Sequence, residues 1–187
     1  MCKICQLHPV YEFTNKRKLC STCFLRWFQK KFLYTIRKYN MIKTKDRAYF
    51  TKGNAINTIV LDDLLKILIK NSLITITKNK RTADKIILPD DVDSTSYNLI
   101  RSIIKGNISK IDIKPNKGKE IKPLYSFLNK EIELYAKIKK LKYKHKKEQK
   151  DKIFMFIDEL ELKHPEIKQA IVNGYLPSIL LKKLAKN

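Results

Sequence analysis

The chain has 187 residues, and its 41 Lys and Arg against 18 Asp and Glu give a formal net charge of +23 at pH 7. A hydrophobic fraction of 43% is too high for a disordered tail, and this length can bury one core. No apolar run approaches the roughly 18–20 residues that a membrane span needs, and the first residues lack the apolar stretch of a signal peptide. We therefore expect a soluble, cytoplasmic protein whose partner is a polyanion such as nucleic acid, and not a membrane.

All four cysteines lie near the start of the chain, as the two C-x-x-C pairs Cys2/Cys5 and Cys20/Cys23. This spacing is typical of a four-thiolate zinc site, because each pair places two sulfurs on one tight turn. Four protein ligands leave no position for water, so we expect a structural metal and not a catalytic one. Two disulfides are disfavoured in the cytosol. An iron–sulfur cluster stays open as an alternative, since an all-cysteine shell also suits iron.

Apolar residues recur every three or four positions after the last cysteine, which predicts an amphipathic helix over 24–39. Its apolar side would carry Leu25, Phe28, Phe32 and Ile36. Five basic residues lie on the other side: Arg26, Lys30, Lys31, Arg37 and Lys38. They form either a solvated face or a ridge that contacts phosphates, and the pattern alone does not decide between these interpretations.

Strands and helices alternate in the next part of the chain. Strands are predicted at 47–51, 73–77, 85–88 and 110–113, and helices at 59–69 and about 94–105, the second ending at Gly106. The stretch 114–122 predicts a basic loop. Two further helices are predicted at 126–141 and 152–162, joined by an exposed charged run over 142–151. The alternation indicates an α/β fold with a mostly parallel sheet covered by helices.

Few residues are suited to catalysis. The sequence has three histidines far apart, no cysteine beyond Cys23 and no Walker-type phosphate loop. The adjacent carboxylates Asp62/Asp63 and Asp90/Asp91 would diverge by about 100° on a helix, so we expect them to be solvated or to cap helices. This inventory argues against an active enzyme.

Several segments occur in a distinctive order. After the cysteine pairs and the basic aromatic helix come RTADKIIL (81–88), then IKGN (104–107), then IKPL (121–124) with EIELYA (131–136), and finally FIDELEL (156–162) with KHPEIK (163–168). The order and the motifs resemble the cytosolic tRNA 2-thiolation proteins. These are ATP-pyrophosphatase enzymes of the PP-loop type that convert a tRNA uridine to 2-thiouridine.

The resemblance also shows what is missing. Enzymes of this family carry SGGKDS after the first strand, where glycines and backbone N–H groups wrap the ATP pyrophosphate. The matching stretch here is Gly53, Asn54, Ala55, Ile56, Asn57 and Thr58. The second glycine, the lysine and the aspartate of the motif are thus replaced. The family's core cysteines and C-terminal zinc-ribbon cysteines are absent too, and the segment 71–81 is short. The resemblance therefore implies a reduced pseudo-enzyme that binds neither ATP nor an iron–sulfur cluster.

We accordingly expect three parts: a zinc-binding module with the basic helix (1–42), a degenerate PP-loop-like α/β domain (43–125) and a helical C-terminal region (126–187). The thiolation system of the family pairs a catalytic member with a non-catalytic relative, and the sequence resembles the second. This implies a subunit that partners the catalytic thiolase and helps to bind tRNA through the basic helix, for 2-thiouridine formation at the wobble uridine. The alternative is a stand-alone zinc-knuckle protein that binds nucleic acid or has a regulatory role.

Overall fold

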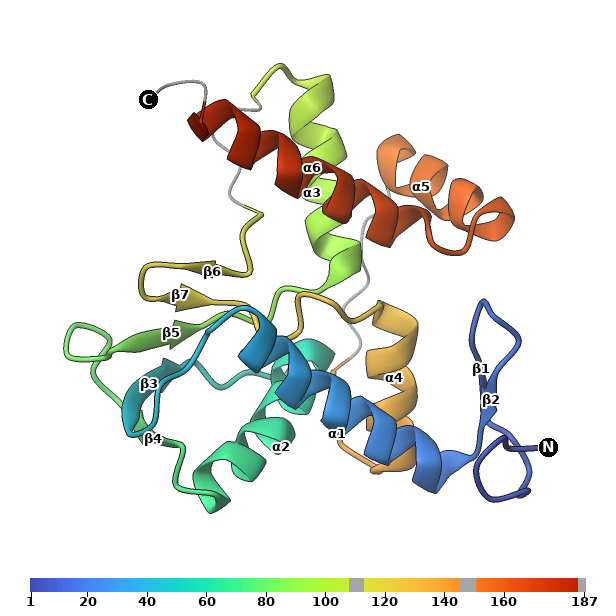
Figure 1. Ribbon diagram of the computed structural model, residues 1–187, viewed down its shortest axis with the longest axis horizontal. Helices are drawn as coiled ribbons and strands as arrows, with labels where there is room; N and C mark the ends of the chain where they lie inside the picture. Colours follow the sequence, from blue (N-terminus) through green and yellow to red (C-terminus); the bar gives the residue numbers. More distant parts are fainter. Residues whose placement is uncertain (108–112, 145–150, 185–187) are drawn as a thin grey trace.

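The computed structural model describes residues 1–107, 113–144 and 151–184, with side chains described as far as Tyr175. The described residues form a five-stranded sheet of order β4-β3-β5-β7-β6 (Figure 1). Its strands are β3 (Asp46–Phe50), β4 (Ile74–Thr77), β5 (Lys85–Ile87), β6 (Asn116–Lys117) and β7 (Glu120–Ile121). β4, β3, β5 and β7 pair in parallel, and β6 pairs antiparallel with β7. The predicted α/β class with a mostly parallel sheet is confirmed.

Six helices are described in the same part of the chain. They are α1 (Ser21–Lys38), α2 (Ile56–Lys70), α3 (Val92–Ile104), α4 (Asn129–Ile138), α5 (Lys152–Lys163) and α6 (Ile167–Leu184). The first five match predicted helices to within a few residues. α6 lies in the C-terminal region expected to be helical, although no separate helix was predicted there. None of the described helices is long and apolar enough to cross a membrane.

The stretch 114–122 differs from its prediction, because it forms the β6–β7 hairpin instead of a loop. Gly118 has a φ of +59°, which allows the two-residue turn between the strands. β7 then adds to the sheet beside β5, with Ile87 opposite Ile121. The strand predicted at 110–113 lies outside the described residues except for Ile113, which is not in a strand. A second hairpin, β1 (Tyr11–Glu12) with β2 (Lys18–Leu19), lies within the cysteine segment.

One hydrophobic core joins the cysteine segment, the sheet and α4. Phe28 of α1 is fully buried, as its spacing predicted, and its ring centroid lies 4.4 Å from those of Phe127 and Tyr135. Fully burying such a side chain contributes about 1.5–3 kcal/mol. The cysteine segment and α4 are therefore held together through α1.

We predict that Phe28→Ala destabilises the protein by about 3–5 kcal/mol, because it removes a buried aromatic ring and leaves a cavity. Tyr34→Ala on the same helix is the matched control, since Tyr34 is 58% exposed. Urea unfolding followed by circular dichroism measures both. Equal losses of unfolding free energy in the two variants would show that α1 does not pack into the core through Phe28.

Candidate functional site

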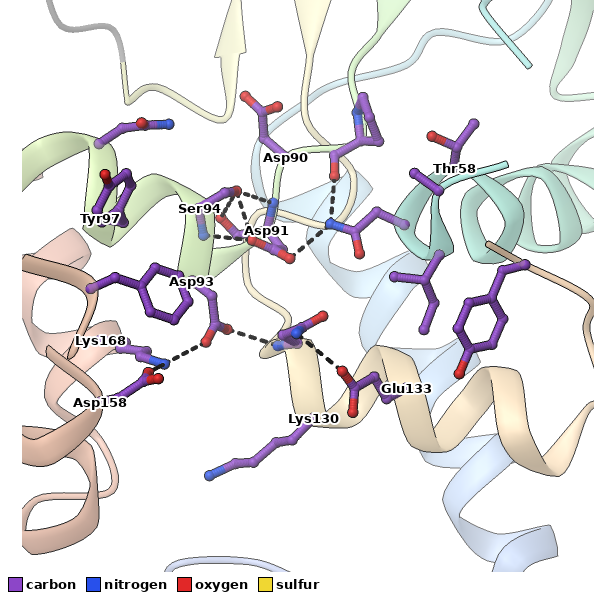
Figure 2. Close-up of a pocket in the computed structure, with 18 of the residues that line it drawn as sticks. Thr58, Asp90, Asp91, Asp93, Ser94, Tyr97, Lys130, Glu133, Asp158 and Lys168 are labelled. Atoms are coloured by element: carbon purple, nitrogen blue, oxygen red, sulfur yellow. Dashed lines mark hydrogen bonds and ion pairs between the residues drawn. The ribbon is translucent and has the colours of Figure 1, made fainter. Parts of the chain in front are cut away.

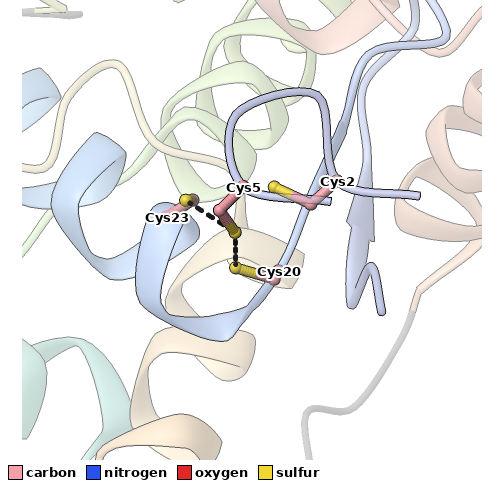
Figure 3. Close-up of side chains that lie close together, drawn as sticks. All are labelled: Cys2, Cys5, Cys20 and Cys23. Carbon is pink, nitrogen blue, oxygen red and sulfur yellow. Dashed lines mark hydrogen bonds between the residues drawn. The ribbon is translucent and has the colours of Figure 1, made fainter. Parts of the chain in front are cut away.

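The four cysteines come together at the start of α1 (Figure 3). Their Sγ atoms all lie within 4.8 Å of one another, with 3.3 Å between Cys5 and Cys20 and 3.6 Å between Cys23 and Cys5. Cys2, Cys20 and Cys23 are buried, whereas Cys5 is exposed, and all four are free of disulfides. The cysteines predicted as ligands thus form one group that could hold a metal ion.

Backbone hydrogen bonds bring the two C-x-x-C turns together. The N–H of Cys2 donates to the carbonyl of Leu7 at 2.8 Å, and this closes the first turn. The N–H of Lys3 donates to the carbonyl of Lys18 at 3.0 Å, which ties that turn to β2 just before Cys20. The β1–β2 hairpin therefore places the second pair opposite the first.

The surroundings of the thiols differ. Burial opposes ionisation of Cys2, but hydrogen bonds from backbone N–H groups, including that of Ile4, lower its pKa to about 6. Burial raises the pKa of Cys23 to about 12. A cation would favour the thiolate form of all four side chains, as metal binding requires.

A cavity of about 1130 Å³ lies where β3 and β5 end (Figure 2). The chain leaves β3 for α2 and β4 on one side, whereas β5 lies on the other side of β3. The strand order thus reverses between β3 and β5, and in α/β sheets such a point is where ligands bind. The start of α2, residues 55–58, forms one wall of this cavity, and residues 89–98 form another.

The stretch 53–58 is held by contacts within the protein. The Asn57 side-chain amide donates to the carboxylate of Asp91 at 2.7 Å and to the carbonyl of Pro89 at 3.1 Å. The carbonyl of Asn54 accepts from the N–H of Lys144 at 2.8 Å. A Cβ added at Gly53 would lie nearest the side chain of Thr58, at an ordinary contact distance of 3.5 Å. The packing of the protein around Gly53 therefore does not itself require a glycine.

The cavity lining is acidic, although the chain is strongly basic. Among the described lining residues, six carry carboxylates and three are lysines. The carboxylates are Asp90, Asp91, Asp93, Glu133, Asp158 and Glu161, and the lysines are Lys130, Lys144 and Lys168. An excess of carboxylates repels a polyphosphate, because like charges in a partly enclosed site are poorly screened.

Two of these lysines are already paired. Lys168 is 5% exposed and donates to Asp93 at 2.7 Å, to Asp158 at 3.0 Å and to Glu161 at 2.6 Å. Burial opposes its charge, but these three partners raise the pKa of Lys168. Lys130 pairs with Glu161 at 3.0 Å. Carboxylates from α3 and α5 thus neutralise the positive charges of Lys168 and Lys130.

The carboxylates singled out in the sequence have separate roles. Asp91 caps α3 by accepting from the N–H of Ser94 at 2.7 Å, as the capping interpretation predicts, and burial raises its pKa. Asp90 pairs with Lys122 at 2.9 Å. Sequence reasoning did not predict that Asp90 and Asp91 would share a cavity with acidic residues of α4 and α5. Lys168 ends the KHPEIK segment, but the sequence did not predict that it would pair with three carboxylates.

Of the five residues predicted to form the basic face of α1, four are exposed and one, Lys31, is mostly buried. Arg26, Lys30, Arg37 and Lys38 are exposed. The Lys31 side chain is only 18% exposed, and its ammonium donates to Glu131 at 2.7 Å and lies over the Trp27 and Phe127 rings. Burial lowers the pKa of Lys31. Lys31 follows the buried Phe28 by three positions, so it falls at the edge of the packed side of the helix and ties α1 to α4.

No family model and no curated protein sequence matches the chain. Among solved structures, it is similar to the U34-tRNA thiolase NcsA from Methanococcus maripaludis, a structure described with its 4Fe–4S cluster. The TM-score is 0.76 at 18% identity, over 97% of this chain and 87% of that chain. The chain is thus only modestly shorter than this neighbour. At this level of identity the likeness establishes the fold alone, which the chain shares with this thiolase.

Proposed function

We propose that the protein is a non-catalytic subunit of a tRNA 2-thiolation complex, which partners the catalytic thiolase and helps to bind tRNA for 2-thiouridine formation at the wobble uridine. The thiolase fold over 97% of the chain supports a role in this system. A stand-alone zinc-knuckle protein would give no reason for the chain to keep that fold beyond its first residues.

The acidic cavity carries the non-catalytic part of the proposal. It lies where a PP-loop enzyme would hold the ATP pyrophosphate, yet carboxylates outnumber lysines there and two lysines are already paired. The Asn57 amide, in place of the motif's aspartate, is bonded to Asp91. The sequence has no cysteine beyond Cys23, so this chain offers the cavity no thiolate for a cluster or for sulfur transfer.

The tRNA-binding part rests on charge. A net charge of +23 favours binding to a polyanion with an affinity that falls as salt rises. We assign Arg26, Lys30, Arg37 and Lys38 to this face and leave out Lys31, whose ammonium is bonded to Glu131.

We predict that Mg–ATP leaves the melting temperature unchanged, whereas tRNA raises it at low salt. A ligand present at 100 times its Kd stabilises the folded state by about 2.7 kcal/mol, which is about 5 °C or more for a chain of this size. Thermal melting with each ligand in turn measures both effects. A clear rise of the melting temperature with Mg–ATP would contradict the proposal that the cavity binds no nucleotide. An unchanged melting temperature with tRNA at every salt concentration would contradict the tRNA-binding role.

We further propose that the cysteine group holds one structural zinc ion. Four thiolates around one zinc, with Zn–S of about 2.3 Å, have sulfurs about 3.8 Å apart, and the group described here spans at most 4.8 Å. A cubane cluster would place its own iron and sulfide atoms between the thiolates and push them farther apart. A structural ion here adds its binding free energy to folding.

The metal assignment predicts about one zinc and no iron per purified chain, measured by elemental mass spectrometry. Cys20→Ser should lose the zinc and lower the melting temperature, because three thiolates hold the ion less tightly. His8→Ala is the control, since His8 lies between the two pairs, is exposed and should not affect the zinc content. Iron with a cluster absorption spectrum, or full zinc in Cys20→Ser, would overturn the assignment.

A further inference from the structure

The edge of the sheet at which the parallel strands begin is rich in basic residues. β3, β5 and β7 run in the same direction, so the stretches that enter them meet at one edge. These stretches are 43–47, 80–85 and 117–120, and together they contain eight Lys or Arg and three carboxylates. The opposite edge, where the strands end, carries the acidic cavity. The two edges thus differ in the sign of their charge.

The stretches before β5 and β7 lie side by side. The Lys85 ammonium donates to the carbonyl of Gly118 at 3.3 Å, and the Lys119 ammonium donates to the carbonyl of Ala83 at 2.9 Å. Figure 1 shows the β4–β5 loop and the β6–β7 turn at the same end of the sheet, on the left. Two loops far apart in the sequence therefore form one surface.

This surface continues onto α1. The Asn116 side-chain amide donates to the carbonyls of Tyr39 and Asn40, at 3.0 and 2.9 Å, and so fixes the hairpin against the end of that helix. The last turn of α1 carries the exposed Arg37 and Lys38. Arg47 is exposed but pairs with Asp84. The other exposed basic residues of the sheet edge define what we call the amino-edge surface: Lys43, Lys45, Lys80, Arg81, Lys117 and Lys119.

Two of the three carboxylates at this edge are engaged by neighbouring residues. Asp84 accepts from the backbone N–H of Arg47 at 2.9 Å and from its guanidinium at 3.2 Å, and these bonds lower the pKa of Asp84. Asp46 accepts from the backbone N–H of Lys43 at 2.8 Å. The basic side chains of the surface thus keep an excess of positive charge toward solvent.

We propose that the amino-edge surface binds the phosphate backbone of tRNA, together with the end of α1. Neighbouring strands lie about 4.8 Å apart, so the basic stretches before β3, β5 and β7 form a short row. When lysines and arginines form such a row, they hold a nucleic-acid backbone in place without reading its bases. The identity of the RNA rests on the proposed function, whereas the location of the contact rests on the charges and hydrogen bonds of this edge.

The test compares two variants that each lose three positive charges. The amino-edge variant is Lys43→Gln, Lys80→Gln and Arg81→Gln, which leaves the Lys85 and Lys119 hydrogen bonds in place. The control is Lys105→Gln, Lys152→Gln and Lys163→Gln, all exposed and placed after α3 and at the two ends of α5. Filter binding of unmodified tRNA between about 50 and 200 mM salt gives Kd and its salt dependence for each protein.

We expect the amino-edge variant to bind about tenfold or more weakly at low salt, with a slope of log K against log salt that is smaller by about 2 to 3. The control should keep a slope close to that of the unaltered protein. Equal losses in both variants would mean that binding follows net charge alone, and an unaltered amino-edge variant would place the contact elsewhere; either result overturns the inference. If the unaltered protein fails to bind tRNA at all, the proposed function fails with it.

Discussion

The parallel direction of β3, β5 and β7 determines where charge can gather in this protein. All three strands begin at one edge and end at the other, so loops from distant parts of the sequence meet according to which end of a strand they join. The loops that enter the strands are basic, and those that leave β3 and β5 border an acidic cavity. In parallel α/β sheets, ligands commonly bind at the second edge. The charge distribution instead favours a polyanion at the first.

The cavity combines a position suited to ligands with a lining in which carboxylates outnumber lysines. The start of α2 still faces the start of α3 across the point where the strand order reverses. At the start of α2, the Asn57 amide bonds to Asp91, and its neighbour Ile56 is apolar. Lys168 binds three carboxylates and so stabilises the packing of α3, α5 and α6 without leaving its charge for a ligand. This wall of the cavity therefore contributes to the stability of the helical packing.

Most of the regular structure could be predicted from the sequence, because local patterns determine it. The three- and four-residue spacing of Leu25, Phe28, Phe32 and Ile36 predicted α1, and the C-x-x-C spacing predicted a cysteine group whose sulfurs do lie together. The β6–β7 hairpin could not be predicted in this way. Its strands have two residues each, too few for a pattern, and β7 is stabilised by pairing with β5, where Ile87 lies opposite Ile121, 34 positions later in the chain.

The site was less predictable than the fold, because its character depends on residues that only the tertiary structure brings together. The acidic lining combines side chains from α3, α4 and α5, and no spacing in the sequence relates them. Lys31 could not be told apart from Lys30 by composition, yet one is bonded to Glu131 and the other is exposed. The charged edges of the sheet likewise became visible only when the strand order was known.

The central claim is that RNA contacts the edge where the strands begin and not the cavity where they end. Photocrosslinking of bound tRNA followed by mass spectrometry of the crosslinked peptides tests this most directly. Crosslinks to the exposed side of α1, the β4–β5 loop and the β6–β7 turn are the predicted result. Crosslinks concentrated in 53–58 and 89–98 would contradict the account, because they would place RNA at the retained ligand-binding edge.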